Sequence, residues 1–94
     1  MSFEEFLQTT TANTSPPGLN RPLLALWLEA RGDWEAAHAM AQAADEPAGA
    51  WVHAYLHRKE GDLANAAYWY RQAERPPAKG DLRAEWETIA RTLL

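Results

Sequence analysis

The sequence predicts an all-α fold in which two antiparallel helical hairpins stack on each other, with one further helix towards each end of the chain. Residues 19–47 and residues 48–76 repeat each other at a spacing of 29 positions. Each copy contains a central Gly-Asp pair, which suits a tight turn between two helices. Apolar residues elsewhere recur every three or four positions, as on one face of a helix. We therefore expect a single domain over residues 1–94.

The composition is that of a globular protein, with 47% hydrophobic and 23% charged residues. Cysteine is absent, which excludes disulfides and thiolate metal sites. The net charge is −4 and the basic residues are scattered, so no basic patch indicates a nucleic-acid partner. No apolar run reaches the roughly 20 residues of a membrane span, and the N-terminus lacks the basic region of a secretory signal. We expect a cytoplasmic protein.

Residues 1–18 are expected to form a short helix followed by a linker. Ser2-Phe3-Glu4-Glu5 has the pattern of a capping box, which marks a helix start. Phe3, Phe6 and Leu7 would share one side of that helix. The segment Thr9–Leu19 is rich in Thr, Asn, Ser and Pro, which is typical of a loop.

The first repeat, residues 19–47, should contain one helix over about Arg21–Arg31 and a second that ends near Ala44. Gly32 suits the left-handed position after a helix, and Asp33 suits the N-cap of the next one. Glu35, His38, Gln42 and Asp45 form a polar stripe on the second helix. We therefore expect His38 to be a solvated surface residue.

The second repeat, residues 48–76, follows the same logic. Pro47 is expected in the first turn of its first helix, Gly61 ends that helix, Asp62 caps the next one and Pro76-Pro77 stops it. Tyr68 lies off the core face of this last helix, and is either exposed or packed on the terminal helix. That core face is expected to comprise Leu63, Ala66, Trp69, Tyr70 and Ala73.

Residues 80–94 are expected to form a capping helix that begins at Lys79-Gly80-Asp81. Leu82, Trp86, Ile89 and Leu93 recur there at helical spacing, so one face is apolar. Terminal units of stacked arrays need a lid, and this helix is expected to cover the open end of the stack.

The repeats resemble the tetratricopeptide (TPR) family of helical hairpins. The likeness rests on Gly61-Asp62-Leu63 followed by Ala66, Tyr70 and Ala73, and on Gly32-Asp33-Trp34 followed by Ala37, Ala41 and Ala44. The period of 29 is shorter than the family's 34, and His53 and His57 replace Leu24 and Leu28 of the first copy. The stretch from Gly32 to Tyr70 also resembles a group of small bacterial proteins, a likeness that implies no activity.

The resemblance implies an interaction or scaffolding module that binds a protein or peptide. In the family, the first helix of each hairpin lines a concave groove, and aromatic and arginine side chains commonly anchor interfaces. Arg58 and Lys59 would suit an acidic stretch of a partner. The groove residues implied in this chain are Trp51, Tyr55, Arg58, Lys59, Leu26 and Glu29.

A metal-binding or acid–base site is an alternative. His53, His57 and Glu60 lie on one helical face, and His pairs spaced by four can chelate Zn²⁺. The spacing is a weak signal, because a zinc site needs three or four protein ligands and only His38 and Asp62 are obvious further candidates. These histidines also replace apolar residues, and partly buried histidines with hydrogen-bond partners are more common. We therefore expect no cofactor.

A homodimeric structural protein is a further alternative, because a pair of repeats leaves apolar end faces that a two-fold dimer would cover. An enzyme is not expected. No Ser or Cys is paired with a His in a recognisable motif, and no Gly-rich phosphate loop is present.

Overall fold

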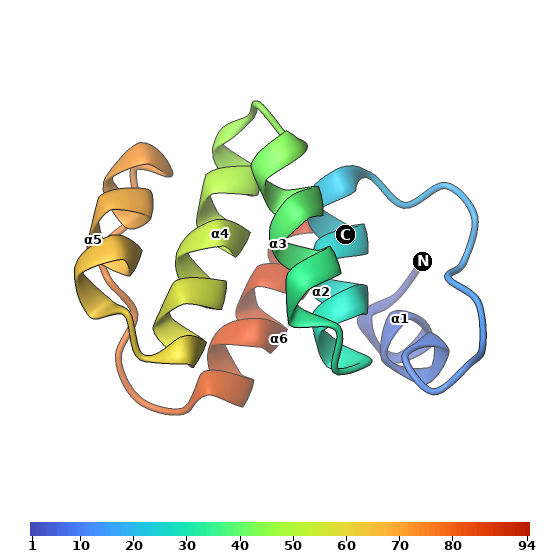
Figure 1. Cartoon of the computed structure of the whole chain (residues 1–94). Helices are drawn as coiled ribbons and strands as arrows, with labels where there is room; N and C mark the ends of the chain where they lie inside the picture. The colour runs from blue at the N-terminus through green and yellow to red at the C-terminus, as the bar shows by residue number, and fades with distance from the viewer.

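The computed structural model describes residues 1–94 and contains six α-helices and no strand (Figure 1), which confirms the all-α class. None of the helices combines the length and the apolar character that crossing a membrane requires. The helices are α1 (Phe3–Thr9), α2 (Arg21–Ala30), α3 (Trp34–Ala43), α4 (Pro47–Glu60), α5 (Leu63–Gln72) and α6 (Leu82–Leu93).

Local sequence signals explain where the helices begin and end. Ser2 and Glu5 form the expected capping box at α1. Asp33 and Asp62 accept hydrogen bonds from backbone N–H groups in the first turns of α3 and α5, as N-caps do. Gly61 ends α4 with a φ of 91°, a conformation that glycine adopts without a steric penalty. These predicted boundaries are confirmed.

The helices α2, α3, α4 and α5 pack side by side in that order, and α5 lies at the edge of the molecule (Figure 1). The terminal helix α6 packs across α2 and α4. The prediction that this helix covers the open end of the stack is therefore wrong. It covers instead the face formed by the first helix of each repeat.

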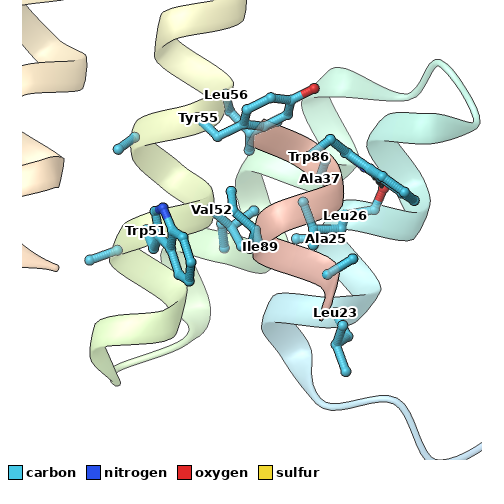
Figure 2. Close-up of a cluster of buried hydrophobic side chains, with 14 of the residues drawn as sticks. Leu23, Ala25, Leu26, Ala37, Trp51, Val52, Tyr55, Leu56, Trp86 and Ile89 are labelled. Atoms are coloured by element: carbon cyan, nitrogen blue, oxygen red, sulfur yellow. Dashed lines mark hydrogen bonds between the residues drawn. The ribbon is translucent and has the colours of Figure 1, made fainter. Parts of the chain in front are cut away.

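The main core lies where α1, α2, α4 and α6 meet, around the nearly inaccessible Trp86. The indole of Trp86 donates a hydrogen bond to the carbonyl of Leu26 at 3.1 Å. Phe3 and Phe6 of α1 pack on the same indole, with ring centroids at 6.0 and 5.7 Å. Figure 2 shows Ile89 of α6 close to Val52 of α4. Burial of these large apolar groups attaches both terminal helices to the repeats.

Only one side of α5 is covered, because α5 packs against α4 and has no helix on its outer side. Ala66, Tyr70 and Ala73 are buried as expected. Leu63 is 66% exposed, so its assignment to the core is wrong. Tyr68 was expected to be either exposed or packed on the terminal helix. It is 46% exposed and lies on the surface.

The start of α4 lies very close to the end of α3, and the contact is at Gly49 and Ala44. A Cβ atom at Gly49 would lie 2.6 Å from the Cβ of Ala44 and 2.7 Å from its carbonyl oxygen. Both distances are well inside van der Waals contact, so glycine is required for this spacing. The result is that the neighbouring faces of α3 and α4 lie close together, and both carry histidines.

Candidate functional site: a three-histidine cluster

All three histidines of the chain converge between α3 and α4. His53 and His57 lie one turn apart on α4, and His38 faces them from α3. One ring nitrogen from each histidine lies within 4.8 Å of the others. His53 and His57 are buried, and His38 is half-buried. We call these three residues the histidine cluster.

Two tryptophans hold the rings of the cluster in place. Trp34 stacks on His38 with ring centroids 4.9 Å apart, and its indole donates a hydrogen bond to the carbonyl of Leu56 at 3.0 Å. Trp69 of α5 stacks on His53 at 3.9 Å with an interplanar angle of 13°. The site is therefore built from three helices, with imidazoles at its centre and indoles on two sides.

Glu60 sets the orientation of His57. The Nδ1 of His57 lies 2.6 Å from a carboxylate oxygen of Glu60. An ionised carboxylate only accepts hydrogen bonds, so Nδ1 carries the proton and donates. In the neutral ring, the lone pair of Nε2 is then free. A carboxylate that orients a histidine in this way is the usual partner of a metal-binding imidazole.

His53 carries a buried polar atom without a partner. The residue is only 3% exposed, and its Nδ1 makes no hydrogen bond. Leaving such an atom unsatisfied costs about 1–3 kcal/mol. The expectation that both α4 histidines have hydrogen-bond partners is thus confirmed for His57, whereas Nδ1 of His53 has none.

The cluster favours neutral imidazoles. Burial, together with the neighbouring His38 and His57, lowers the pKa of His53 to about 4. Burial also lowers the pKa of His38, with His57 acting in the same direction and Glu60 opposing it. At neutral pH both rings are uncharged. The neutral ring is the form that donates a lone pair to a metal ion.

A surface pocket of about 260 Å³ adjoins the cluster at His53 and Trp69. Its walls come from the end of α3, the start of α4 and the end of α5. The polar side chains that line it are Gln42, Asp45, Glu46 and Gln72. The buried His53 ring is thus next to a space that opens to solvent.

The aromatic and apolar residues expected in a groove lie in the core. Trp51, Tyr55 and Leu26 are at most 5% exposed, because α6 covers the face of α2 and α4 on which they lie. Figure 2 shows Tyr55 and Leu26 next to α6. The guanidinium of Arg75 lies 3.6 Å from the ring centroid of Trp51. Burial raises the pKa of Tyr55, as expected for an enclosed phenol.

The charged residues of the expected groove are paired within the chain. Glu29 is buried and forms an ion pair with the exposed Lys59. Arg58 forms an ion pair with the buried Glu85 of α6 at 2.9 Å and also donates to the carbonyl of Gly80. Tyr70 donates to the other oxygen of Glu85.

The predicted groove residues are divided among separate surface pockets rather than lining one groove. Glu29, Tyr55 and Lys59 line one pocket together with the start of α6. Trp51 and Arg58 each line a different pocket.

His38 was considered as a further ligand, but its environment was predicted wrongly. Its place in a polar stripe suggested solvent, yet it is half-buried and its ring centroid lies 4.5 Å from that of His53. The relevant signal is Trp34, one helical turn before His38, because an aromatic residue at that spacing can cover the imidazole.

Comparison with protein-family models, with curated proteins and with solved structures finds no match to this chain.

Proposed function

We propose that the protein binds a divalent transition-metal ion of the zinc type at the histidine cluster. The observation that carries the proposal is the convergence of every histidine in the chain on one point, with a buried and unpartnered Nδ1 on His53. Imidazole nitrogen suits Zn²⁺, Cu²⁺ and Ni²⁺. A metal bond to Nδ1 of His53 would also satisfy the atom that the fold leaves without a hydrogen bond.

The dimensions of the cluster suit such an ion after small adjustments. Tetrahedral zinc with Zn–N distances near 2.05 Å places its nitrogens about 3.3 Å apart. The three ring nitrogens lie within 4.8 Å of one another, so the side chains must approach one another by at most about 1.5 Å. Glu60 already orients His57 from outside the cluster, as in carboxylate–histidine–zinc arrangements.

Isothermal titration of tag-free protein with ZnCl₂ tests the proposal. We expect one saturable site per chain, and no saturable heat in the His53→Ala and His57→Ala variants. Glu60→Gln removes the charge that orients His57 and should weaken binding about 10- to 100-fold. Glu4→Gln removes the same charge from an exposed site on α1 and serves as the matched control.

Circular dichroism distinguishes a lost site from a lost fold in each variant. The chain contains no other histidine and no cysteine. The alternative ligand set is His57, Glu60 and Asp62, and zinc binding that persists in His53→Ala would assign the ion to that set. Heat no greater than that of dilution, with a folded wild-type protein, would overturn the proposal.

A protein-interaction module is the second candidate, and the outer face of α5 favours it. Leu63 and Tyr68 are large, exposed and on a helix that has a neighbour on one side only. In this reading α2–α3 and α4–α5 are two TPR-like hairpins, and the next helix of the stack comes from a second molecule. Exposed apolar residues on such an edge are typical of association surfaces.

Self-association through α5 is directly measurable. Sedimentation equilibrium should give a mass that rises from monomer to dimer between low and high micromolar concentrations, and Leu63→Lys should abolish the rise. Gln8→Lys, at an exposed position of α1, is the control. A constant monomer mass in all three proteins would exclude a second copy as the occupant of this face.

A further inference from the structure

We propose that the histidine cluster holds its metal ion with one coordination position open, and that this position takes a small Lewis base from the pocket beside His53. The inference rests on the proposed metal-binding function and goes beyond it. It assigns the site to the class that exchanges a ligand rather than to the closed, structural class.

The first argument is the number of donors. A structural zinc site has four protein ligands, whereas an open site has three. The atoms that converge come from His38, His53 and His57. The chain has no cysteine that could complete the set. The fourth ligand can then only be a carboxylate or a molecule from outside the protein. Asp45 and Glu46 line the pocket beside His53 but are not among the convergent ligand atoms.

The nearby carboxylates have other partners. Glu60 is within hydrogen-bond distance of Nδ1 of His57. Together with His57 and Asp62 it forms a second group that could hold a metal ion, and this group lacks His38 and His53. Asp62 is exposed and accepts a hydrogen bond from the backbone N–H of Asn65 as the N-cap of α5. Neither carboxylate is placed to close the coordination sphere at His53.

The second argument is access. The pocket that adjoins His53 and Trp69 has a volume of about 260 Å³. A water molecule occupies about 30 Å³ in the liquid, so the pocket has room for a ligand of several heavy atoms. His53 belongs both to the cluster and to the wall of this pocket, so a ligand that binds the ion on the side of His53 would enter through it.

The pocket walls define the class of ligand. Gln42 and Gln72 offer amide groups that donate and accept hydrogen bonds, whereas Asp45 and Glu46 add negative charge. This combination disfavours multiply charged anions such as phosphate. It suits a neutral or singly charged molecule that binds the metal through one oxygen or nitrogen. Water is the simplest member of this class, and metal coordination would lower its pKa towards neutrality.

Cobalt substitution tests the open position. Co²⁺ in the zinc position has visible absorption bands that change when a ligand of the ion is replaced. We expect sodium azide to change the spectrum of the Co²⁺-loaded protein in a saturable manner, with one equivalent bound. Imidazole, as a larger neutral ligand, should do the same.

A blocking variant tests the route. Gln42→Trp places a large side chain at an exposed position of the pocket wall and should weaken imidazole binding at least tenfold while Co²⁺ affinity stays the same. Gln8→Trp on α1 is the matched control and should leave both unchanged.

The outcomes separate this inference from the proposed function. A Co²⁺ spectrum that neither azide nor imidazole alters would overturn the open position and leave the metal site standing. If Gln42→Trp binds imidazole as tightly as the wild type does, the open coordination position does not face this pocket. Absence of any Co²⁺ spectrum would overturn the metal site itself, and this inference with it.

Discussion

His53 unites features that are individually uncommon in a histidine. It is buried, it stacks on Trp69, and its Nδ1 has no hydrogen-bond partner. A purely structural residue at this position would be more stable as an apolar side chain, because the unsatisfied nitrogen is destabilising. Retaining an imidazole there is understandable if the nitrogen binds something, which is the role proposed for it.

The lowered pKa of His53 predicts how stability depends on pH in the metal-free protein. The pKa is about 4 in the folded protein and 6.5 ordinarily, so between these values the unfolded chain binds more protons than the folded one. The contribution that the neutral His53 ring makes to the free energy of unfolding is therefore fully present above pH 6.5. It is lost as the pH falls towards 4. We expect the unfolding free energy to drop by about 2 kcal/mol between pH 8 and pH 5.

Urea denaturation in the presence of a chelator, followed by circular dichroism, measures this drop. His53→Gln should flatten the dependence between pH 8 and pH 5. The lowered pKa of His38 makes stability depend on pH in the same direction, although Glu60 partly offsets the lowering. A smaller decrease of the unfolding free energy with falling pH should therefore remain in His53→Gln. Identical slopes in the wild type and in His53→Gln would contradict the assignment.

Some residue roles could be predicted from the sequence, and the reasons are local. Asp33, Asp62 and Ser2 are N-caps as expected, because a cap depends on a few neighbouring backbone groups. His38 could not be assigned in this way. Its environment is set by α4, which follows it in the chain, and a polar stripe on one helix does not reveal which neighbour will cover it.

At the scale of elements, α6 has a role that its own amphipathic pattern does not specify. The apolar face of α6 was predicted from the sequence. The surface that it covers, formed by α2 and α4, was not. The decisive contacts are Trp86 with Leu26 and Glu85 with Arg58, both more than twenty positions apart in the sequence. Such long-range pairs have no signature in the spacing of a single helix, and for that reason α6 was wrongly expected at the end of the stack.

The ion pair between Glu85 and Arg58 should be one of the main attachments of α6 to α4. Glu85→Ala would leave a guanidinium that is only 12% exposed without its partner and Tyr70 without its acceptor. Removing one member of a buried pair typically costs about 3–5 kcal/mol. We expect a loss of this size in the unfolding free energy, measured by urea denaturation.

Glu87→Ala provides the comparison on the same helix. Glu87 pairs with Arg91 at 2.8 Å, but both side chains are about half exposed, and exposed pairs contribute about 0–1 kcal/mol. Arg58→Ala combined with Glu85→Ala should cost less than the sum of the two single changes. Equal, small losses for Glu85→Ala and Glu87→Ala would show that α6 is held by apolar contacts alone.

At the scale of the whole molecule, the helical class and the helix boundaries followed from repeated turn signals, whereas the location of the site did not. The histidine pair on α4 was recognised as a weak metal signal, and the TPR-like resemblance directed attention to the face of α2 and α4. That face is filled by α6, and the cluster formed elsewhere, between α3, α4 and α5. Which helix lies on which face is decided by the packing of the complete chain.

The position of α6 also means that the chain supplies an occupant for this face. The segment of residues 73–81 joins α5 to α6 and acts as a tether. Short tethers hold a bound element at an effective concentration of about 1 mM. A free helix at about 1 µM would therefore need roughly a thousandfold higher intrinsic affinity than α6 to displace it from half of the molecules.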